Sequence, residues 1–379
     1  MERAGVAQLA PHAPHVEGRR VVTVNEFLQF VVEKGGSDLH LKAGGPAYVR
    51  IDGELKPIQT LPPLSPADTE RFAFSMMDDR TMSEFMERNE ADFAYSLPGV
   101  GRFRVNAFRQ RGSVGAVLRR VLPGTPDFEA LGLPPAVRKL SEEHRGLVLV
   151  TGPTGSGKTT TTAAMIGHIN RTRRCHIVTI EDPIEVMHRD EQSIIDQREV
   201  GVDTSNFSTA LKGVARQDPD VIFIGEMRDI ETVTAALQAA ETGHFVLSTL
   251  HTTDARETVN RIVDMFPSEQ QNQARLSLAN SLKGIVCQRL APRATGEGRV
   301  AVIECLVMTS RIYDFIIDPA QTEMIEDAVA EGQYYGMQTF DQHLLQLYKD
   351  GEITLRDALS TATNPHDFRV SIRAAGLAG

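Results

Sequence analysis

One short stretch, GPTGSGKT at residues 152–159, constrains the fold of this chain more than any other part of its sequence. Its glycines, Lys158 and Thr159 match the phosphate-binding loop G-x-x-x-x-G-K-(S/T), which requires a buried strand before it and a helix after it. Both conditions are met, because an apolar run at 147–150 precedes the loop and a helical pattern at 160–170 follows it. The sequence therefore predicts an α/β domain that binds a polyphosphate, rather than a glycine-rich surface turn.

The residues of this loop have separate expected roles. The glycines let backbone N–H groups turn inward around phosphate oxygens, and the N-terminus of the following helix adds a positive dipole end. Lys158 is expected to reach the β- and γ-phosphate oxygens, and Thr159 to hold Mg²⁺ through its hydroxyl. The expected nucleotide-binding residues are Gly152, Pro153, Thr154, Gly155, Ser156, Gly157, Lys158, Thr159 and Thr160.

Length and a change in composition predict two domains. The 379 residues exceed the roughly 250 to 300 residues at which a single core stops growing. A stretch rich in proline and glycine at 123–135 separates two different patterns and is expected to be a linker. The predicted domains are a small α+β domain at 21–122, behind a mobile tail at 1–20, and a larger α/β domain at 136–379.

The larger domain is expected to contain a parallel sheet. Short, almost wholly apolar segments at 147–150, 177–180, 221–224 and 245–250 alternate with longer helical patterns. Strands that are buried on both faces have this composition, and helices then cover both sides of the sheet. After about residue 268 the pattern becomes mainly helical.

Acidic residues follow two of these apolar segments. Glu226 ends the run DVIFIGE, which has the form of a Walker B strand, and is expected to position Mg²⁺ or the attacking water. Glu181 and Glu185 follow the segment 177–180, at a strand end where open α/β sheets bind ligands. One of them could orient water or metal, and a solvated turn is the alternative explanation.

Two histidines flank the apolar segment 245–250. His244 and His251 are seven residues apart, so an extended strand separates them by about 23 Å and points them to opposite faces. That separation excludes a shared metal ion. One histidine could lie near the γ-phosphate, or both could be hydrogen-bonded residues at the ends of a strand.

Arginines gather in the predicted strands of the first domain. An arginine has the charge and the planar geometry to bind a transferring phosphoryl group, within its own chain or across a subunit interface. A solvated basic strand face is the other explanation. The residues concerned are Arg102, Arg104, Arg109, Arg111, Arg119 and Arg120.

Composition and charge weigh against several other classes of protein. No apolar run reaches the roughly 18 to 20 residues of a membrane span. The three cysteines, Cys175, Cys287 and Cys305, are isolated, and the first residues lack the basic-then-apolar order of a secretory signal. We therefore expect a cytoplasmic protein without a zinc site. A formal net charge of −10 gives no reason to expect nucleic-acid binding.

Five sequence boxes occur in order along the chain: GPTGSGKTT (152–160), IEDPIE (180–185), QREVG (197–201), DVIFIGEMRD (220–229) and AAETGHFVLSTLHT (239–252). Together they resemble the secretion ATPases that drive type II secretion and type IV pili. Within that superfamily the chain is similar to the twitching-motility retraction ATPases, the PilT/PilU family, over about residues 22–373.

The resemblance implies a PAS-like first domain, a RecA-like second domain and a homohexameric ring that hydrolyses ATP with Mg²⁺. It implies that Lys158 and Thr159 bind Mg-ATP and that Glu226 holds Mg²⁺, directly or through water. Such a ring would act on a platform protein of the pilus, from the cytoplasmic face of the inner membrane. The catalytic residues that the resemblance implies are Glu226, Glu181, Glu185, His244, His251, Arg104 and Arg119.

Further features bear on the branch of this family. Extension and type II secretion ATPases usually add a long N-terminal domain and a four-cysteine metal-binding insert, and this sequence contains neither. The run at 336–354 resembles the PilU branch, whereas SRIYDFIID at 310–318 differs from the AIRNLIRE-like segment of typical PilT chains.

Two expectations follow, an autonomous retraction motor and an accessory ATPase that acts with a second retraction ATPase. A nucleic-acid translocase on the same fold is a third, and the net charge of −10 argues against it.

Overall fold

The computed structural model describes residues 15–16, 19–20, 22–51, 53–58 and 63–377. Its contacts divide the chain after Pro123 into two units. Most of the tail expected at 1–20 lies outside the described residues, and its described residues are β1 (His15–Val16) and β2 (Arg19–Arg20), which pair with each other. Among the helices of the described ranges, none is long and apolar enough to cross a membrane.

The first unit is an antiparallel sheet with helices on one face. Its strands follow the order β5-β4-β3-β8-β7-β6, and one face packs Phe103, Leu118 and Leu39 against apolar residues of the helices. Helix α1 starts where Thr23 and Glu26 form reciprocal cap hydrogen bonds. The elements are α1 (Val24–Glu33), β3 (Asp38–Leu41), β4 (Tyr48–Ile51), β5 (Glu54–Pro57), α2 (Pro66–Phe74), α3 (Asp79–Arg88), β6 (Glu90–Leu97), β7 (Gly101–Gln110) and β8 (Ser113–Pro123).

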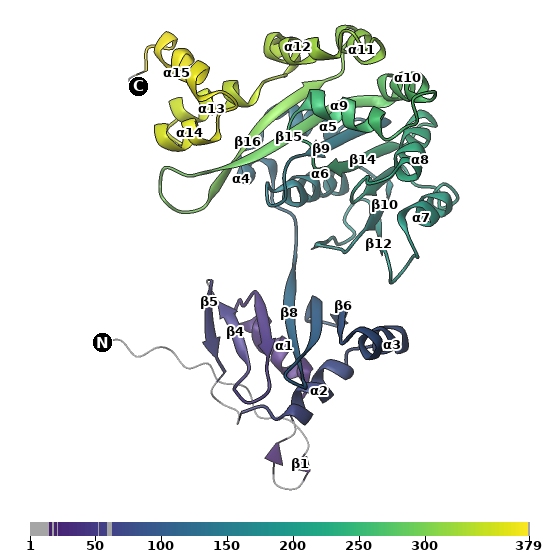
Figure 1. Cartoon of the computed structure of the whole chain (residues 1–379), viewed down its shortest axis with the longest axis vertical. Coiled ribbons are helices and arrows are strands. Elements are labelled where there is room, and N and C mark those ends of the chain that lie inside the picture. Colours follow the sequence, from purple (N-terminus) through teal and green to yellow (C-terminus); the bar gives the residue numbers. More distant parts are fainter. Residues whose placement is uncertain (1–14, 17–18, 21, 52, 59–62, 378–379) are drawn as a thin grey trace. The chain divides into compact units, whose positions relative to one another are not determined.

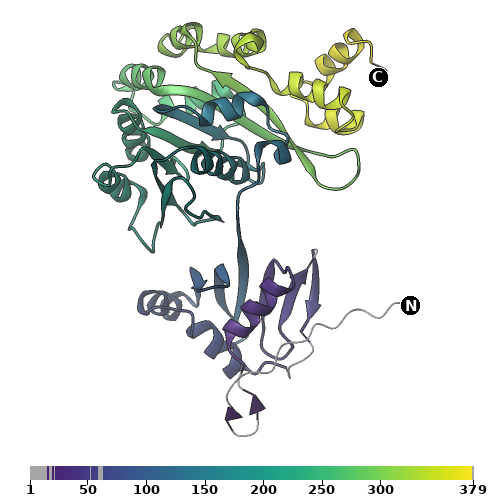
Figure 2. The same cartoon turned by 180° about the vertical axis from the view of Figure 1, so that it is seen from behind.

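The second unit is a sheet between two layers of helices (Figures 1 and 2). Its strands follow the order β12-β10-β13-β14-β9-β15-β16, and every neighbouring pair is parallel except β15 with β16. Alternate residues of the central strands enter two cores, as Leu147 and Leu149 face one and Val148 and Val150 face the other. This confirms the predicted parallel sheet that helices cover on both sides.

The four apolar segments identified in the sequence are the central strands β9, β10, β13 and β14. From Phe128 to Val307 the elements of the second unit are α4 (Phe128–Leu131), α5 (Pro135–Ser141), β9 (Gly146–Thr151), α6 (Lys158–Thr172), β10 (His176–Glu181), β11 (Val186–Met187), β12 (Ile194–Glu199), α7 (Phe207–Val214), β13 (Val221–Ile224), α8 (Ile230–Glu241), β14 (Phe245–Leu250), α9 (Ala255–Asp264), α10 (Gln271–Ser281), β15 (Leu282–Pro292) and β16 (Arg299–Val307), of which β11 is not a strand of this sheet.

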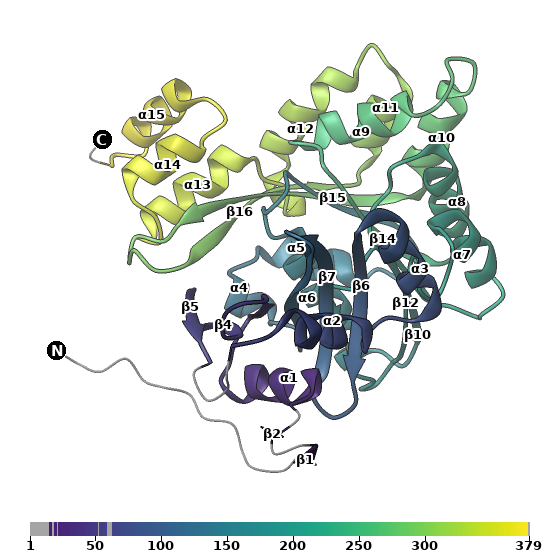
Figure 3. The ribbon, with the colours of Figure 1, turned by 60° about the horizontal axis from the view of Figure 1, so that its bottom comes forward.

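Helices follow the last strand. Figure 3 shows α13 to α15 gathered beside one end of the β15–β16 hairpin, and α13 packs on β16 while α14 packs on β15. The helices after β16 are α11 (Ser310–Ile317), η1 (Thr322–Met324), α12 (Ile325–Glu331), η2 (Gly332–Tyr335), α13 (Phe340–Lys349), α14 (Leu355–Thr361) and α15 (Pro365–Ala374).

Two sequence expectations need correction. The region after about 268 is mainly helical, but 282–307 is an exception, because β15 and β16 form a long antiparallel ladder there beside β9. The strand β15 escapes detection because Lys283, Gln288 and Arg289 interrupt its apolar pattern.

The expected linker at 123–135 contains the helix α4. Phe128 of this helix is buried in the same core as Ile169 of α6, and Arg171 of α6 pairs with Asp127 at 2.7 Å. Residues 124–135 therefore pack as part of the second unit, although their proline and glycine content is typical of a linker.

Candidate nucleotide-binding site

The phosphate-binding loop joins β9 to α6 and is shaped by glycines. Gly157 immediately precedes α6 with a φ of 91°, a conformation that favours glycine. At Gly152, a Cβ atom would lie 2.3 Å from the Gln288 carbonyl oxygen, so only glycine fits between the loop and β15. The strand β15 therefore packs directly against the loop.

Gln288 of β15 is a residue of this site that the sequence analysis missed. Its side chain is 2% exposed and donates from Nε2 to the Ser156 carbonyl oxygen at 2.7 Å. Its Oε1 accepts from the Thr161 hydroxyl at 2.7 Å. One buried amide therefore fixes the loop to the first turns of α6. Its strand lay in a region expected to be helical, so no sequence signal pointed to it.

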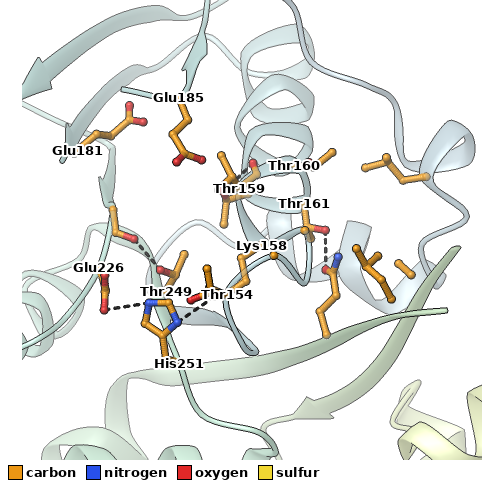
Figure 4. Close-up of a pocket in the computed structure, with 18 of the residues that line it drawn as sticks. Thr154, Lys158, Thr159, Thr160, Thr161, Glu181, Glu185, Glu226, Thr249 and His251 are labelled. Carbon is orange, nitrogen blue, oxygen red and sulfur yellow. Dashed lines mark hydrogen bonds and ion pairs between the residues drawn. The ribbon is translucent and has the colours of Figure 1, made fainter. Parts of the chain in front are cut away.

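Three predicted residues form a connected chain. His251 Nδ1 lies 3.3 Å from Lys158 Nζ, and His251 Nε2 lies 3.2 Å from Glu226 Oε1 (Figure 4). An ammonium group can only donate, so Nδ1 of a neutral His251 accepts from Lys158 and Nε2–H donates to Glu226. Lys158 also donates to the carbonyl oxygens of Gly152 at 2.6 Å and Pro153 at 3.1 Å. The site thus links the loop, the Walker B strand and the loop after β14.

Neighbouring groups set the pKa values of Lys158 and Glu226. Burial lowers the pKa of Lys158, and the carboxylates of Glu226 and Glu185 oppose that effect. Burial also opposes ionisation of Glu226, but the hydrogen bond from Arg228 and the proximity of His251 outweigh it and lower the pKa of Glu226. Glu226 is therefore a carboxylate at neutral pH, able to accept from His251 and Arg228.

The two glutamates of the IEDPIE box occupy different environments. Glu181 is 8% exposed, and burial raises its pKa although Thr179 and Gln197 donate to it at 2.7 and 3.1 Å. Glu185 is exposed and projects toward the start of α6 near Thr159 (Figure 4). Glu185 is thus the better placed of the two to meet a ligand at the loop.

A pocket of about 830 Å³ opens beside the loop, within the second unit. All three acids of the IEDPIE box line it, as do Glu226, His251 and Lys158. Its apolar lining includes Leu131, Leu133 and Leu290, of which the first two lie in the segment expected to be a linker. The pocket therefore combines a polar end at the phosphate loop with apolar side chains suited to a flat ring.

The residues around the loop fit a phosphate group. Ser156 is 4% exposed, and its Oγ has no hydrogen-bond partner among the described residues. Thr159 and Glu226 line the same pocket and offer the oxygen ligands that Mg²⁺ prefers. Among the described residues no cluster of three or more His, Cys, Asp or Glu could hold a metal ion.

The structure places the other predicted site residues elsewhere. His244 lies at the opposite end of β14 from His251, where its ring contacts the Ala239 carbonyl oxygen at 3.0 Å and the Thr242 hydroxyl at 3.2 Å. It does not line the pocket. Arg104 and Arg119 face each other across β7 and β8 in the first unit. Arg119 Nε donates to the buried Asp38 at 2.8 Å, which holds its largely exposed guanidinium in place.

Comparison with known proteins decides the family. A model of type II/IV secretion system proteins matches residues 17–360. The chain is 45% identical to the type IV pilus ATPase PilU of Pseudomonas aeruginosa, over 92% of this chain and 91% of that protein. It is 44% identical to the type IV pilus retraction ATPase PilT of the same organism, over 91% of this chain and 99% of that protein. The chain belongs to the PilT/PilU family of secretion ATPases.

A solved structure supports the same assignment. The crystal structure of the pilus retraction motor PilT with bound ADP is 47% identical, with a TM-score of 0.83, and covers 92% of this chain and 99% of that chain. The protein is therefore a nucleotide-binding ATPase of the type IV pilus retraction family, with a PAS-like first domain and a RecA-like second domain.

Proposed function

We propose that this protein is an ATP-driven motor that powers type IV pilus retraction and twitching motility. The observation that carries the proposal is the connected chain Lys158–His251–Glu226, which links the phosphate loop to the Walker B strand inside one pocket. The similarity to PilU and PilT over more than 90% of the chain supports retraction as the process driven. The motor acts as a homohexamer on an inner-membrane platform protein, from the cytoplasmic face of that membrane.

The site suggests how the chain's residues act on ATP. Backbone N–H groups of 152–159 and Lys158 bind the phosphates, and Leu131, Leu133 and Leu290 contact the base. Thr159 and Glu226, the latter directly or through water, would hold Mg²⁺, which neutralises charge on the phosphates. Glu226 and Glu185 orient the water that attacks the γ-phosphorus, and a carboxylate accepts its proton as the bond to the β-phosphate oxygen breaks. Glu181 supports the acidic box from within the core.

The arginines of the first domain complete the proposal. Arg104 and Arg119 occupy one cross-strand pair, and like charges held this close favour binding of an anion between them. We assign them to the phosphates of a nucleotide at a subunit interface, so that hydrolysis is coupled to movement of the first domain. His244 lies away from the pocket of its own chain, so any catalytic role for it is also at an interface.

A second candidate function is an accessory ATPase that assembles with another retraction ATPase. The chain is almost equally identical to PilU and PilT, and its segment at 310–318 diverges from typical PilT chains. Both observations are compatible with an accessory function. This segment forms α11, whose Arg311 pairs with Glu331 of α12. Retraction sustained by this protein in cells that lack any second retraction ATPase would exclude the accessory function.

Two substitutions test the ATPase site. Lys158→Ala is expected to abolish nucleotide binding or turnover, and Glu226→Gln to bind ATP but hydrolyse it slowly. The exposed Lys139 and Glu231 provide matched controls, Lys139→Ala and Glu231→Gln, which should leave both properties unchanged. An undiminished ATPase rate in either site variant would contradict the assignment.

Assembly is tested on the same samples. ATP hydrolysis is measured over a series of protein concentrations, with light scattering after size exclusion. Activity that rises with a hexamer peak supports a ring with sites completed between subunits. A monomer without turnover would favour the accessory function.

A further inference from the structure

A buried carboxylic acid lies close to the nucleotide pocket without lining it. Glu304 of β16 is 8% exposed, and its Oε1 accepts a hydrogen bond from the Ala255 backbone N–H at 2.9 Å. Ala255 is the first residue of α9, where backbone N–H groups have no partner within the helix. A carboxylate at this position also meets the positive end of the helix dipole. Glu304 therefore anchors the start of α9 to the sheet.

The position of Glu304 in the sheet relates it to the phosphate loop. Cross-strand pairs run from Thr151 of β9 to Cys287 of β15 and from Cys287 to Glu304. Thr151 directly precedes Gly152, and Cys287 directly precedes Gln288, which supports the loop. The carboxyl thus lies in the row of residues at the end of the sheet where the pocket opens.

The contact fixes the segment that carries His251. Only residues 252–254 separate His251 from Ala255. Thr252 is buried and its hydroxyl lies 2.6 Å from that of Thr258, while Asp254 accepts from the Glu257 N–H at 2.8 Å. On the other side of His251, β14 is held in the sheet between β13 and β9. The bond from Ala255 to Glu304 therefore ties the far end of this short loop to the sheet.

Burial makes the ionised form of Glu304 unfavourable, which a purely structural anchor does not need. The pKa of Glu304 is raised to about 7, mainly by burial and also by Asp254 and Glu326, against the opposing effects of the Ala255 N–H and Arg289. Asp254 precedes α9, Glu326 lies on α12, and Arg289 lies on β15. The thiols of Cys287 and Cys305 are also adjacent, and burial raises their pKa values, so both are neutral. A neutral side chain of this shape would satisfy the fold.

We propose that Glu304 is a positioning residue for ATP hydrolysis, whose carboxylate holds the 251–255 loop so that His251 bridges Lys158 and Glu226. The inference rests on the proposed role of His251 in the site. The ionised carboxylate makes a stronger, charge-assisted hydrogen bond to Ala255 than the protonated acid does. Turnover is accordingly faster when Glu304 is charged, and ATP binding by the phosphate loop is little affected.

Glu304→Gln in the full-length protein tests the proposal, because glutamine keeps the shape and remains uncharged. Between pH 6 and 8.5, kcat of the wild type should rise through an apparent pKa near 7, and the variant should lack the Glu304 contribution. At pH 8.5 we expect a kcat about fivefold lower, as for a charge-assisted hydrogen bond replaced by a neutral one, with KM for ATP changed by less than about twofold. A pH profile that superimposes on the wild type would overturn the proposal.

A double-mutant cycle separates positioning of His251 from a general structural effect. If Glu304 acts through His251, Glu304→Gln should have little further effect in a His251→Ala background, whereas additive effects would overturn the proposal. Amide hydrogen exchange of residues 250–258 gives a readout independent of activity. Exchange there should be faster in Glu304→Gln and unchanged in α6, and unchanged exchange at 250–258 would also contradict the proposal.

His343→Gln is the matched control. His343 of α13 is another buried side chain that accepts a hydrogen bond from a backbone N–H, in this case that of Ile303 of β16 at 2.9 Å. It should leave the pH profile of kcat between pH 6 and 8.5 unchanged. If His251→Ala itself retains full activity, the proposed site is wrong. If only the Glu304 variants behave as wild type, the site stands and the further inference fails.

Discussion

Gln288→Leu should destabilise the phosphate loop without removing any residue that contacts nucleotide. The leucine side chain has a similar size but cannot make the hydrogen bonds to the Ser156 carbonyl oxygen and the Thr161 hydroxyl, both 2.7 Å long. Two buried polar groups then lose their partner, at about 1 to 3 kcal/mol each, offset in part by the apolar side chain. We expect a loss of about 2 to 4 kcal/mol in the free energy of unfolding.

The effect should appear in stability and in nucleotide affinity together. For a domain of this size, about 1 kcal/mol shifts Tm by about 2 to 4 °C, so the variant should melt roughly 5 to 15 °C below the wild type. Because Gln288 fixes the loop that binds the phosphates, ADP affinity should fall by about tenfold, which corresponds to about 1.4 kcal/mol. Calorimetric melting and titration of ADP into the purified protein measure both quantities.

Gln192→Ala is the matched control, because Gln192 also donates to a backbone carbonyl oxygen, that of Arg171 at 2.7 Å, but is exposed. Its Tm should change by less than about 2 °C, as for most surface substitutions. A Gln288→Leu variant with the Tm and ADP affinity of the wild type would refute the argument that β15 supports the loop.

Three further outcomes follow from buried or paired titratable groups. His343 is buried, and desolvation lowers its pKa to about 4, so its neutral form stabilises the fold above pH 6.5 and that stability is lost as pH falls toward 4. In His343→Leu, Tm measured between pH 6.5 and 4 should therefore depend less on pH than in the wild type. Glu304 has a raised pKa, so the folded state loses stability as pH rises from 4.5 to about 7, and Glu304→Gln should unfold at higher urea than the wild type at pH 8 but not at pH 4. Asp38→Asn should release Arg119 and lower kcat of the assembled protein, whereas Asp92→Asn, at an exposed carboxylate that contacts Asn106, should not.

The central part of the fold could be predicted because its signals are local. Short stretches of sequence are enough to recognise a phosphate loop, a Walker B strand and the apolar segments. These signals locate β9, β10, β13 and β14. The same signals predicted Lys158, Glu226 and His251, and the structure brings these three together.

The rest of the site depends on contacts between distant residues. Gln288 and Glu304 look like ordinary polar interruptions of a strand, and only the pairing of β15 with β9 and β16 shows what they contact. The helix α4 was hidden because proline and glycine mark both linkers and tightly packed loops, and its packing depends on Phe128 meeting α6. A local sequence pattern contains neither the pairing of β15 with its neighbours nor the packing of α4 on α6.

The two contacts of the His251 ring join these observations into one argument. A protonated His251 would place a third positive charge beside Lys158 and Arg228, and its Nδ1 could no longer accept from Lys158. The chain Lys158–His251–Glu226 therefore requires a neutral ring with its proton on Nε2. Glu304 acts on the other end of the same loop, and its own charge strengthens the anchor at Ala255 as pH rises. Turnover should therefore fall with acid as Glu304 takes up its proton near pH 7, and Glu304→Gln should remove that part of the fall.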